Sequence, residues 1–207
     1  MKTATCRLTL SQRKRLDILA AARAEFLEAG FRDTSMDRVA QRAEVSKRTV
    51  YNHFPSKEAL FTAIASQFME ELRQAISVAY DPERLLEEQL QEIAKREITQ
   101  ITRPDYIGMF RVFLGEAGSF QSVFKEVLEE SNAGLDPLES WIEAAHADGR
   151  LQVRSSGLAA MQFNSLLKGA LFWPLIAGYG KPLSKREQGV ILDEAIAMFL
   201  ARYGCQG

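Results

Sequence analysis

The stretch that most constrains the fold of this chain is residues 34–57, which read TSMDRVAQRAEVSKRTVYNHFPSK. This pattern predicts a helix, a tight turn, a second short helix over residues 46–54 and the start of a third helix. Ser46 can cap the middle helix by accepting a hydrogen bond from a backbone N–H in its first turn. Val50 and Phe54, four residues apart, give this helix one apolar side. We therefore expect that side to pack against neighbouring helices.

The opposite side of the middle helix carries hydrogen-bond donors. At about 100° per residue, Arg48 and Asn52 point furthest from the apolar side. The flanking positions and the first turn add Thr49, Tyr51, His53 and Lys47. Such a helix suits the major groove of double-stranded DNA, in which Arg and Lys pair with guanine, Asn pairs with adenine, and Tyr, His and Thr reach phosphates. The alternative is that Tyr51 and His53 simply pack at the surface of a small helical bundle.

The charge of the chain is unevenly distributed. The 207 residues carry a net charge of −1. Residues 1–60 hold 12 Lys and Arg against 7 Asp and Glu, a net of +5, whereas residues 61–207 hold 14 against 20, a net of −6. A basic first quarter joined to an acidic remainder is expected if only the N-terminal part meets a polyphosphate. A chance fluctuation in surface charge is the alternative.

Composition limits the class of protein. A hydrophobic content of 46% with a charged content of 26% is ordinary for a soluble globular protein, and no apolar run reaches the length of a membrane span. The first residues lack the apolar core of a secretory signal, so we expect a cytoplasmic protein without a membrane partner. Cys6 and Cys205 stand near opposite ends without metal-ligand spacing, which favours reduced thiols over a disulfide.

Two further helices complete the N-terminal pattern. The first is expected over residues 11–30 and ends at a glycine, which reaches the left-handed conformation at no steric cost. The second is expected to open at Thr34, whose hydroxyl forms a T-x-x-D capping box with the carboxylate of Asp37. Ser56 caps the third helix, and Lys57 lies in its first turn. Because the helix dipole disfavours a cation there, a nearby phosphate would explain the lysine.

A longer motif, spread over roughly residues 13–61, is carried by Ile18, Ala22, Phe26, Gly30, Phe31, Thr34, Val39, Ala40, Ala43, Val45, Ser46, Tyr51, His53, Phe54, Ser56, Lys57, Leu60 and Phe61. This motif resembles the DNA-binding module of the TetR (tetracycline repressor) family. The resemblance implies contacts to bases or nearby backbone by Lys47, Arg48, Thr49, Tyr51 and Asn52. It implies phosphate contacts by Thr34, Ser35, His53 and Lys57, and the cap residue Ser46 completes the predicted DNA-binding set.

Glu44 departs from the family pattern. It occupies the turn position at which the family usually has glycine. A left-handed backbone at a glutamate costs on the order of 1 kcal/mol. The departure therefore concerns the local geometry of the turn and leaves the rest of the module unaffected.

Beyond residue 57 the pattern predicts helices and no strands. Apolar residues recur every four positions at Leu60, Ile64, Phe68, Leu72 and Ile76 until Asp81 and Pro82. One helix of roughly 24 residues, about 36 Å long, is therefore expected to connect two domains. Further helices are expected over residues 83–102, 106–114, 119–148 with a possible break at 132–134, 158–177, and 184–203. The fold class is all-α, with a helix-turn-helix domain in residues 1–57 and a helical effector-binding and dimerisation domain in residues 58–207.

The C-terminal half contains two runs, FRVFLGEAGSFQSVFKEVLEE and GLAAMQFNSLLKGALFWPLIAG, that are similar to the AefR-like group of TetR regulators. In the family the last two helices pair with their copy in a four-helix bundle, which implies a homodimer through roughly residues 158–203 and a palindromic operator. The candidates for an effector pocket are Phe110, Phe113, Phe124, Trp141, Phe163, Leu167 and Trp173. These side chains either form tightly packed core or wall a pocket for a small apolar or amphipathic effector.

The sequence gives less support to other classes of function. The two histidines, His53 and His146, have no accompanying nucleophile, metal-ligand spacing or glycine-rich phosphate loop, so we expect no enzymatic activity, no cofactor and no metal. A helical scaffold or small-molecule carrier that does not bind DNA is the stronger rival. The resemblance implies a ligand-responsive transcriptional regulator, with repression favoured over activation.

Overall fold

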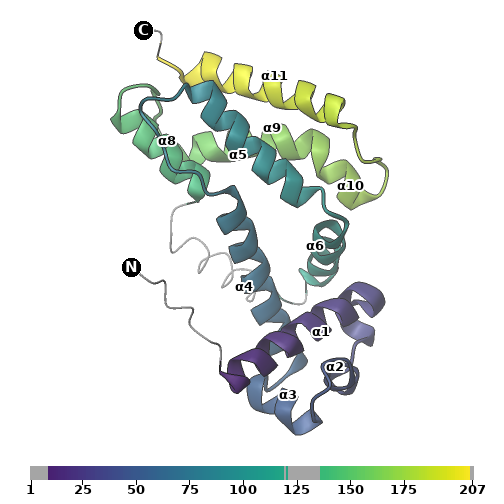
Figure 1. Ribbon diagram of the computed structural model, residues 1–207. Helices are drawn as coiled ribbons and strands as arrows, with labels where there is room; N and C mark the ends of the chain where they lie inside the picture. The colour runs from purple at the N-terminus through teal and green to yellow at the C-terminus, as the bar shows by residue number, and fades with distance from the viewer. Residues whose placement is uncertain (1–8, 119, 121–135, 206–207) are drawn as a thin grey trace. The chain divides into compact units, whose positions relative to one another are not determined.

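The computed structural model describes residues 9–118, 120 and 136–205, and these residues form α-helices and loops without a β-strand (Figure 1). The all-α prediction is confirmed. Packing divides the chain into two compact units. The first unit comprises Met1–Phe68 and Arg111–Val127, and the second comprises Met69–Phe110 and Leu128–Gly207. In the described residues, no helix is both long enough and apolar enough to cross a membrane.

The first unit is built around α1 (Leu10–Asp33), α2 (Met36–Arg42) and α3 (Lys47–His53), and it takes in the beginning of α4 (Lys57–Ile76) and the end of α6 (Pro104–Glu116). Its core is aromatic. The Phe61 ring is fully buried, and its centroid lies 5.9 Å from that of Phe26, 4.9 Å from that of Phe31 and 5.3 Å from that of Phe113. These edge-to-face contacts join α1, α4 and α6 through a single side chain.

The predicted start of the second helix is wrong by one residue. Ser35 is the N-cap of α2, and its hydroxyl accepts a hydrogen bond from the Arg38 backbone N–H at 3.3 Å. The Thr34 hydroxyl instead donates to the Gly30 carbonyl at 2.7 Å and also lies 3.2 Å from the Glu25 carbonyl, so no Thr34–Asp37 capping box forms. Gly30 has a φ of 76°, as expected for a glycine that ends a regular helix.

The connecting helix α4 is shorter than predicted. It has 20 residues and ends at Ile76, before the expected stop at Asp81. Two of the four residues that follow form contacts of their own: the Ser77 carbonyl accepts a hydrogen bond from Arg96 at 2.9 Å, and the Tyr80 hydroxyl donates to Asp148. Ser and Val have modest helix propensity, so these tertiary contacts decide where α4 ends.

The second unit contains α5 (Leu86–Ile101), α8 (Pro137–Ala147), α9 (Ser156–Leu171), α10 (Trp173–Ala177) and α11 (Lys185–Tyr203). Helices α5, α9 and α11 lie side by side, and α8 packs against α9 (Figure 1). The centre of this unit is formed by the buried side chains of Leu90, Ile93, Leu138, Trp141, Ile142, Phe163 and Leu167. The Ser184–Glu187 capping box at the start of α11 is present as predicted.

The helix predicted over residues 158–177 is divided in two. Helix α9 ends at Leu171, and α10 begins at Trp173. Pro174 explains the break, because it lacks a backbone N–H and its ring would clash with the carbonyl four residues earlier. The helices predicted over residues 83–102 and 106–114 are observed as α5 and α6 with shifted ends. Of the segment 119–148, the structure describes α8, and the possible break at 132–134 lies outside the described residues.

Buried polar side chains join the helices of the second unit. Gln89 is fully buried and accepts hydrogen bonds from the Trp141 indole N–H at 3.1 Å and from the Asp81 backbone N–H at 2.9 Å. Glu97 of α5 is also buried, and the Lys168 ammonium of α9 lies 3.0 Å from its carboxylate. A buried carboxylate needs such a partner because its desolvation is costly.

Tyr106 makes the stability of the second unit sensitive to alkaline pH. Burial, with a smaller contribution from the Glu97 carboxylate, raises the pKa of the Tyr106 phenol. The tyrosines of the unfolded chain ionise near pH 10, so the stabilisation due to Tyr106 is complete below about pH 10 and is lost as the pH rises toward the folded-state pKa.

We predict that Tyr106→Phe flattens the alkaline part of the stability profile. Between pH 10 and 11.5 the wild-type free energy of unfolding should fall by about 1.4 kcal/mol per pH unit more than that of the variant. Urea unfolding at a series of pH values measures both slopes. Tyr179→Phe, which removes an exposed tyrosine of the same unit, is the matched control. Equal slopes in wild type and Tyr106→Phe would contradict the prediction.

Candidate nucleic-acid interface

Helix α3 presents one packed side and one open side, as the sequence predicted. The Ser46 hydroxyl caps it by accepting from the Thr49 backbone N–H at 3.1 Å. Val50 and Phe54 are buried. The exposed side chains on the other side are those of Lys47, Arg48, Tyr51 and Asn52, whereas Thr49 and His53 are half-buried. The structure therefore gathers the predicted base-contacting residues on one short, capped helix.

The turn before α3 has the strained backbone that the sequence predicted. Glu44 has a φ of 53°, and it is the non-glycine residue with positive φ in the described part of the chain. Its backbone N–H donates to the Gln41 carbonyl at 3.2 Å, and the Val45 N–H donates to the Ala40 carbonyl at 3.0 Å. The turn therefore keeps its hydrogen bonds, at an expected cost on the order of 1 kcal/mol for the left-handed glutamate.

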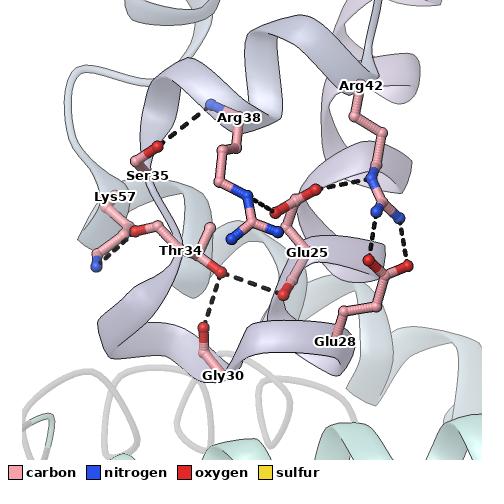
Figure 2. Close-up of polar contacts among 8 residues, drawn as sticks. All are labelled: Glu25, Glu28, Gly30, Thr34, Ser35, Arg38, Arg42 and Lys57. Carbon is pink, nitrogen blue, oxygen red and sulfur yellow. Dashed lines mark hydrogen bonds and ion pairs between the residues drawn. The ribbon is translucent and has the colours of Figure 1, made fainter.

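A buried carboxylate joins α1 to α2 (Figure 2). The Glu25 side chain is only 4% exposed, and its two oxygens lie 2.8 Å from the Nε atoms of Arg38 and Arg42. Arg42 also binds Glu28 through two N–H groups, and this hydrogen bonding lowers the pKa of the Glu28 carboxyl. Release of either arginine would leave a buried carboxylate with less compensation. We therefore assign Arg38 and Arg42 to holding α2 in place.

Lys57 is bound inside the first unit. Its ammonium donates to the carbonyls of Phe31 at 2.7 Å, Arg32 at 3.0 Å and Thr34 at 2.9 Å, and it lies 4.5 Å from the centroid of the Phe31 ring. These bonds use all three N–H groups of a lysine. They satisfy carbonyls at the end of α1, the end of a helix that favours a cation. The carbonyl groups at the C-terminus of α1 therefore explain why a lysine stands in the first turn of α4. The sequence alone suggested a nearby phosphate instead.

The other predicted phosphate contacts differ in their availability. The Thr34 side chain is buried, and its hydroxyl proton is directed at backbone carbonyls. Ser35 is exposed, but its hydroxyl oxygen already caps α2. His53 lies beside Phe54 with ring centroids 6.5 Å apart. At these positions the backbone N–H groups and the imidazole remain the groups best suited to meet DNA.

Sequence reasoning missed the acidic partners of this site, Glu25, Glu28 and Asp37. A signal for Glu25 was present, because this charged residue stands next to Phe26 in the core-facing stripe of α1. Arg38 and Arg42 are four residues apart and so share one face of α2. Asp37 lies in the first turn of α2, and its carboxylate is 2.7 Å from the Lys47 ammonium.

The candidates for an effector pocket do not gather in one place. Phe113 belongs to the first unit, and Phe124 lies outside the described residues. Trp141, Phe163 and Leu167 are fully buried in the core of the second unit.

Trp173 and Phe110 remain, with ring centroids 6.0 Å apart. Trp173 is 47% exposed and lines a cavity of about 350 Å³ together with Asn164 and Lys168 of α9. In the described part of the chain, no group of three His, Cys, Asp or Glu side chains is placed to hold a metal ion.

A capped helix with exposed donors, held behind a second helix by a tight turn, defines a helix-turn-helix DNA-binding protein. Residues 18–64 match the family model described as bacterial regulatory proteins of the tetR family. Residues 88–205, more than half of the chain, match the model for the C-terminal domain of AefR-like transcriptional repressors. The chain belongs to the TetR family of transcriptional regulators, whose members are not enzymes.

Solved structures and relatives agree with this assignment. A TetR family transcriptional regulator from Pseudomonas syringae pv. tomato is 40% identical, with a TM-score of 0.79 over 95% of this chain and 100% of that chain. The Flavonoid-responsive Regulator FrrA is 29% identical, with a TM-score of 0.78 over 94% and 99% of the two chains. The regulator YhgD of Bacillus subtilis is 41% identical over 70 residues, which are 34% of this chain and about a third (36%) of that relative.

We predict that Glu25→Gln lowers the free energy of unfolding by about 2 kcal/mol, because a neutral amide replaces a buried carboxylate that binds two guanidinium groups. Urea unfolding of the full chain, followed by far-UV circular dichroism, measures this loss. Glu28→Gln is the matched control: it removes an exposed partner of the same Arg42 and should change stability little. If Glu25→Gln were no more destabilising than Glu28→Gln, the assignment of Glu25 as the tie between α1 and α2 would be wrong.

Proposed function

We propose that this TetR-family protein is a ligand-responsive repressor. It binds a palindromic operator as a homodimer and leaves the operator when a small apolar or amphipathic molecule binds to the second unit. The observation that carries the proposal is the exposed row of Lys47, Arg48, Tyr51 and Asn52 on a helix whose other side is locked into the core. Such a row meets base edges only when the helix enters a major groove.

The DNA contacts are shared between two groups of residues. Lys47, Arg48, Thr49, Tyr51 and Asn52 face bases or the adjacent backbone. Ser35, Ser46 and His53 approach phosphates at the starts of α2 and α3 and at the end of α3, where backbone N–H groups add to the attraction at the helix N-termini. Thr34 and Lys57 contribute by fixing the backbone that presents these groups, in keeping with their internal hydrogen bonds.

A homodimer through roughly residues 158–203 accounts for the apolar side chains on the outside of the last helices. Leu158 and Met161 of α9 and Val190 and Met198 of α11 are exposed. Large apolar side chains on two adjacent helices favour burial against a second copy. A two-fold dimer presents two α3 helices to successive major grooves, about 34 Å apart, and so requires a palindromic site.

The cavity beside Trp173 is the proposed effector site. It is open to solvent, and its volume of about 350 Å³ lies in the range that suits small ligands. It combines the exposed indole with the polar side chains of Asn164 and Lys168 and with the carboxylates of Asp136 and Glu139. FrrA, described as flavonoid-responsive, is similar to this chain over nearly its whole length. We infer that planar aromatic molecules with polar substituents are the compounds to test first.

We predict that in vitro selection of bound DNA recovers a palindrome, and that Arg48→Ala relaxes base preference at one position of each half-site. Loss of a bidentate contact to guanine should reduce discrimination there by about 1–3 kcal/mol. Sequencing of selected DNA measures both properties. Arg154→Ala, at an exposed arginine of the second unit, removes the same charge and should leave the selected sequence unchanged. Selection of a single half-site would argue against the dimer.

We also predict that a flavonoid effector weakens operator binding roughly 5- to 150-fold, because effector and DNA favour different conformations. The operator dissociation constant with and without each compound of a flavonoid panel measures the coupling. Trp173→Ala should lose the response and keep the affinity for DNA. A panel that shifts neither the thermal midpoint nor the operator affinity would contradict the proposed effector class.

A further inference from the structure

The cationic side chains around the recognition helix α3 differ in whether their partners within the protein are buried or exposed. Arg38 and Arg42 bind the buried Glu25 carboxylate, and Lys57 binds three backbone carbonyls. These side chains cannot turn to DNA without leaving a buried polar group uncompensated. Lys47 is different, because its partner is the carboxylate of Asp37 and both side chains are open to water, 59% and 65% exposed.

The Lys47–Asp37 pair is well formed. The lysine Nζ lies 2.7 Å from one carboxylate oxygen of Asp37 and 3.1 Å from the other. The hydrogen bond to this carboxylate raises the pKa of the Lys47 ammonium, and a lysine is protonated at neutral pH in any case. Lys47 stands in the first turn of α3 and Asp37 in the first turn of α2. Both starts belong to the part of the module that faces the sugar-phosphate backbone in a helix-turn-helix complex.

We propose that Asp37 competes with DNA phosphate for Lys47 and thereby lowers the affinity of this protein for DNA of any sequence. Exposed ion pairs contribute little free energy, so a phosphate can take the place of the Asp37 carboxylate. While the pair persists, Lys47 releases no counterion from DNA. This competition weakens the electrostatic attraction that dominates non-specific binding.

The proposal gives Asp37 a role in setting how tightly the protein holds DNA of any sequence. Non-specific binding depends almost entirely on cation–phosphate contacts, whereas operator binding also draws on base contacts. A carboxylate that occupies one cation of α3 weakens both modes by a similar factor. The ratio between operator affinity and non-specific affinity is then unchanged, and the base contacts of Arg48 and Asn52 still decide where the protein stays.

The test uses the full-length chain and a 30-base-pair duplex of mixed sequence, so that no knowledge of the operator is needed. Asp37→Asn should bind this duplex roughly three- to fivefold more tightly at low salt. The plot of log affinity against log salt concentration should steepen by about 0.9 for each recognition helix engaged. Fluorescence anisotropy between 50 and 200 mM salt measures both quantities. Glu88→Gln, an equal change of charge at an exposed position of α5 outside the proposed dimer interface, should show neither effect.

A double-mutant cycle separates competition for Lys47 from simple repulsion of DNA. In a Lys47→Met background, Asp37→Asn should bring little gain, because no lysine is released. A full gain in that background, unchanged affinity of Asp37→Asn, or weaker binding by Asp37→Asn would each overturn the proposal.

Two further measurements keep the outcomes distinct. Thermal unfolding establishes that each variant is folded at the assay temperature, and Asp37→Ser removes the carboxylate by a second route. The inference rests on DNA binding by α3, and it does not depend on the effector. Failure of the wild-type protein to bind duplex DNA would count against the DNA-binding function itself.

Discussion

The carboxylate of Glu25 is the contact on which the geometry of the DNA-binding module most depends. It is buried within α1 and binds both arginines on one face of α2. An isolated buried carboxylate is very unfavourable, so the two helices gain most when the guanidinium groups stay in place. The position of α3 depends on the same contact, because the tight turn through Glu44 leaves little freedom between α2 and α3. The recognition helix is thus positioned by a charge that never reaches DNA.

Lys57 fixes the start of α4 in a similar way, through polar contacts inside the first unit. Its ammonium binds the carbonyls at the end of α1 and the one at Thr34, so the first residue of α4 is fastened to the segment between α1 and α2. A change in the direction of α4 at this point therefore acts on α2 as well as on α1. Substitution of Lys57 consequently has two effects, on the stability of the module and on DNA binding, which the sequence alone presents as one phosphate contact.

The sequence predicted those features that local chemistry determines. Ser46 and Ser184 cap their helices because each hydroxyl lies within reach of a backbone N–H three residues on, and Glu44 is strained because the turn requires a left-handed residue there. Tertiary contacts decided the rest. Thr34 and Ser35 are equally good caps in sequence, and only the packing of α1 against the Thr34 hydroxyl selects Ser35. In the same way, aromatic composition could not separate the sealed core around Trp141 and Phe163 from the cavity beside Trp173, because that distinction depends on which helices meet.

Helix α6 makes aromatic contacts near both of its ends, and the two sets of contacts lie in different units. Near its start, Tyr106 and Phe110 pack against Phe172, with ring centroids 5.9 and 4.9 Å away, inside the second unit.

Toward the other end of α6, Phe113 contacts Phe61, and Glu116 lies 3.1 Å from Arg32 at the end of α1, inside the first unit. A close-packed aromatic cluster resists compression, so each end of α6 is held firmly within its own unit. The Trp173 ring, with its centroid 5.4 Å from that of Phe172, extends the cluster of the second unit.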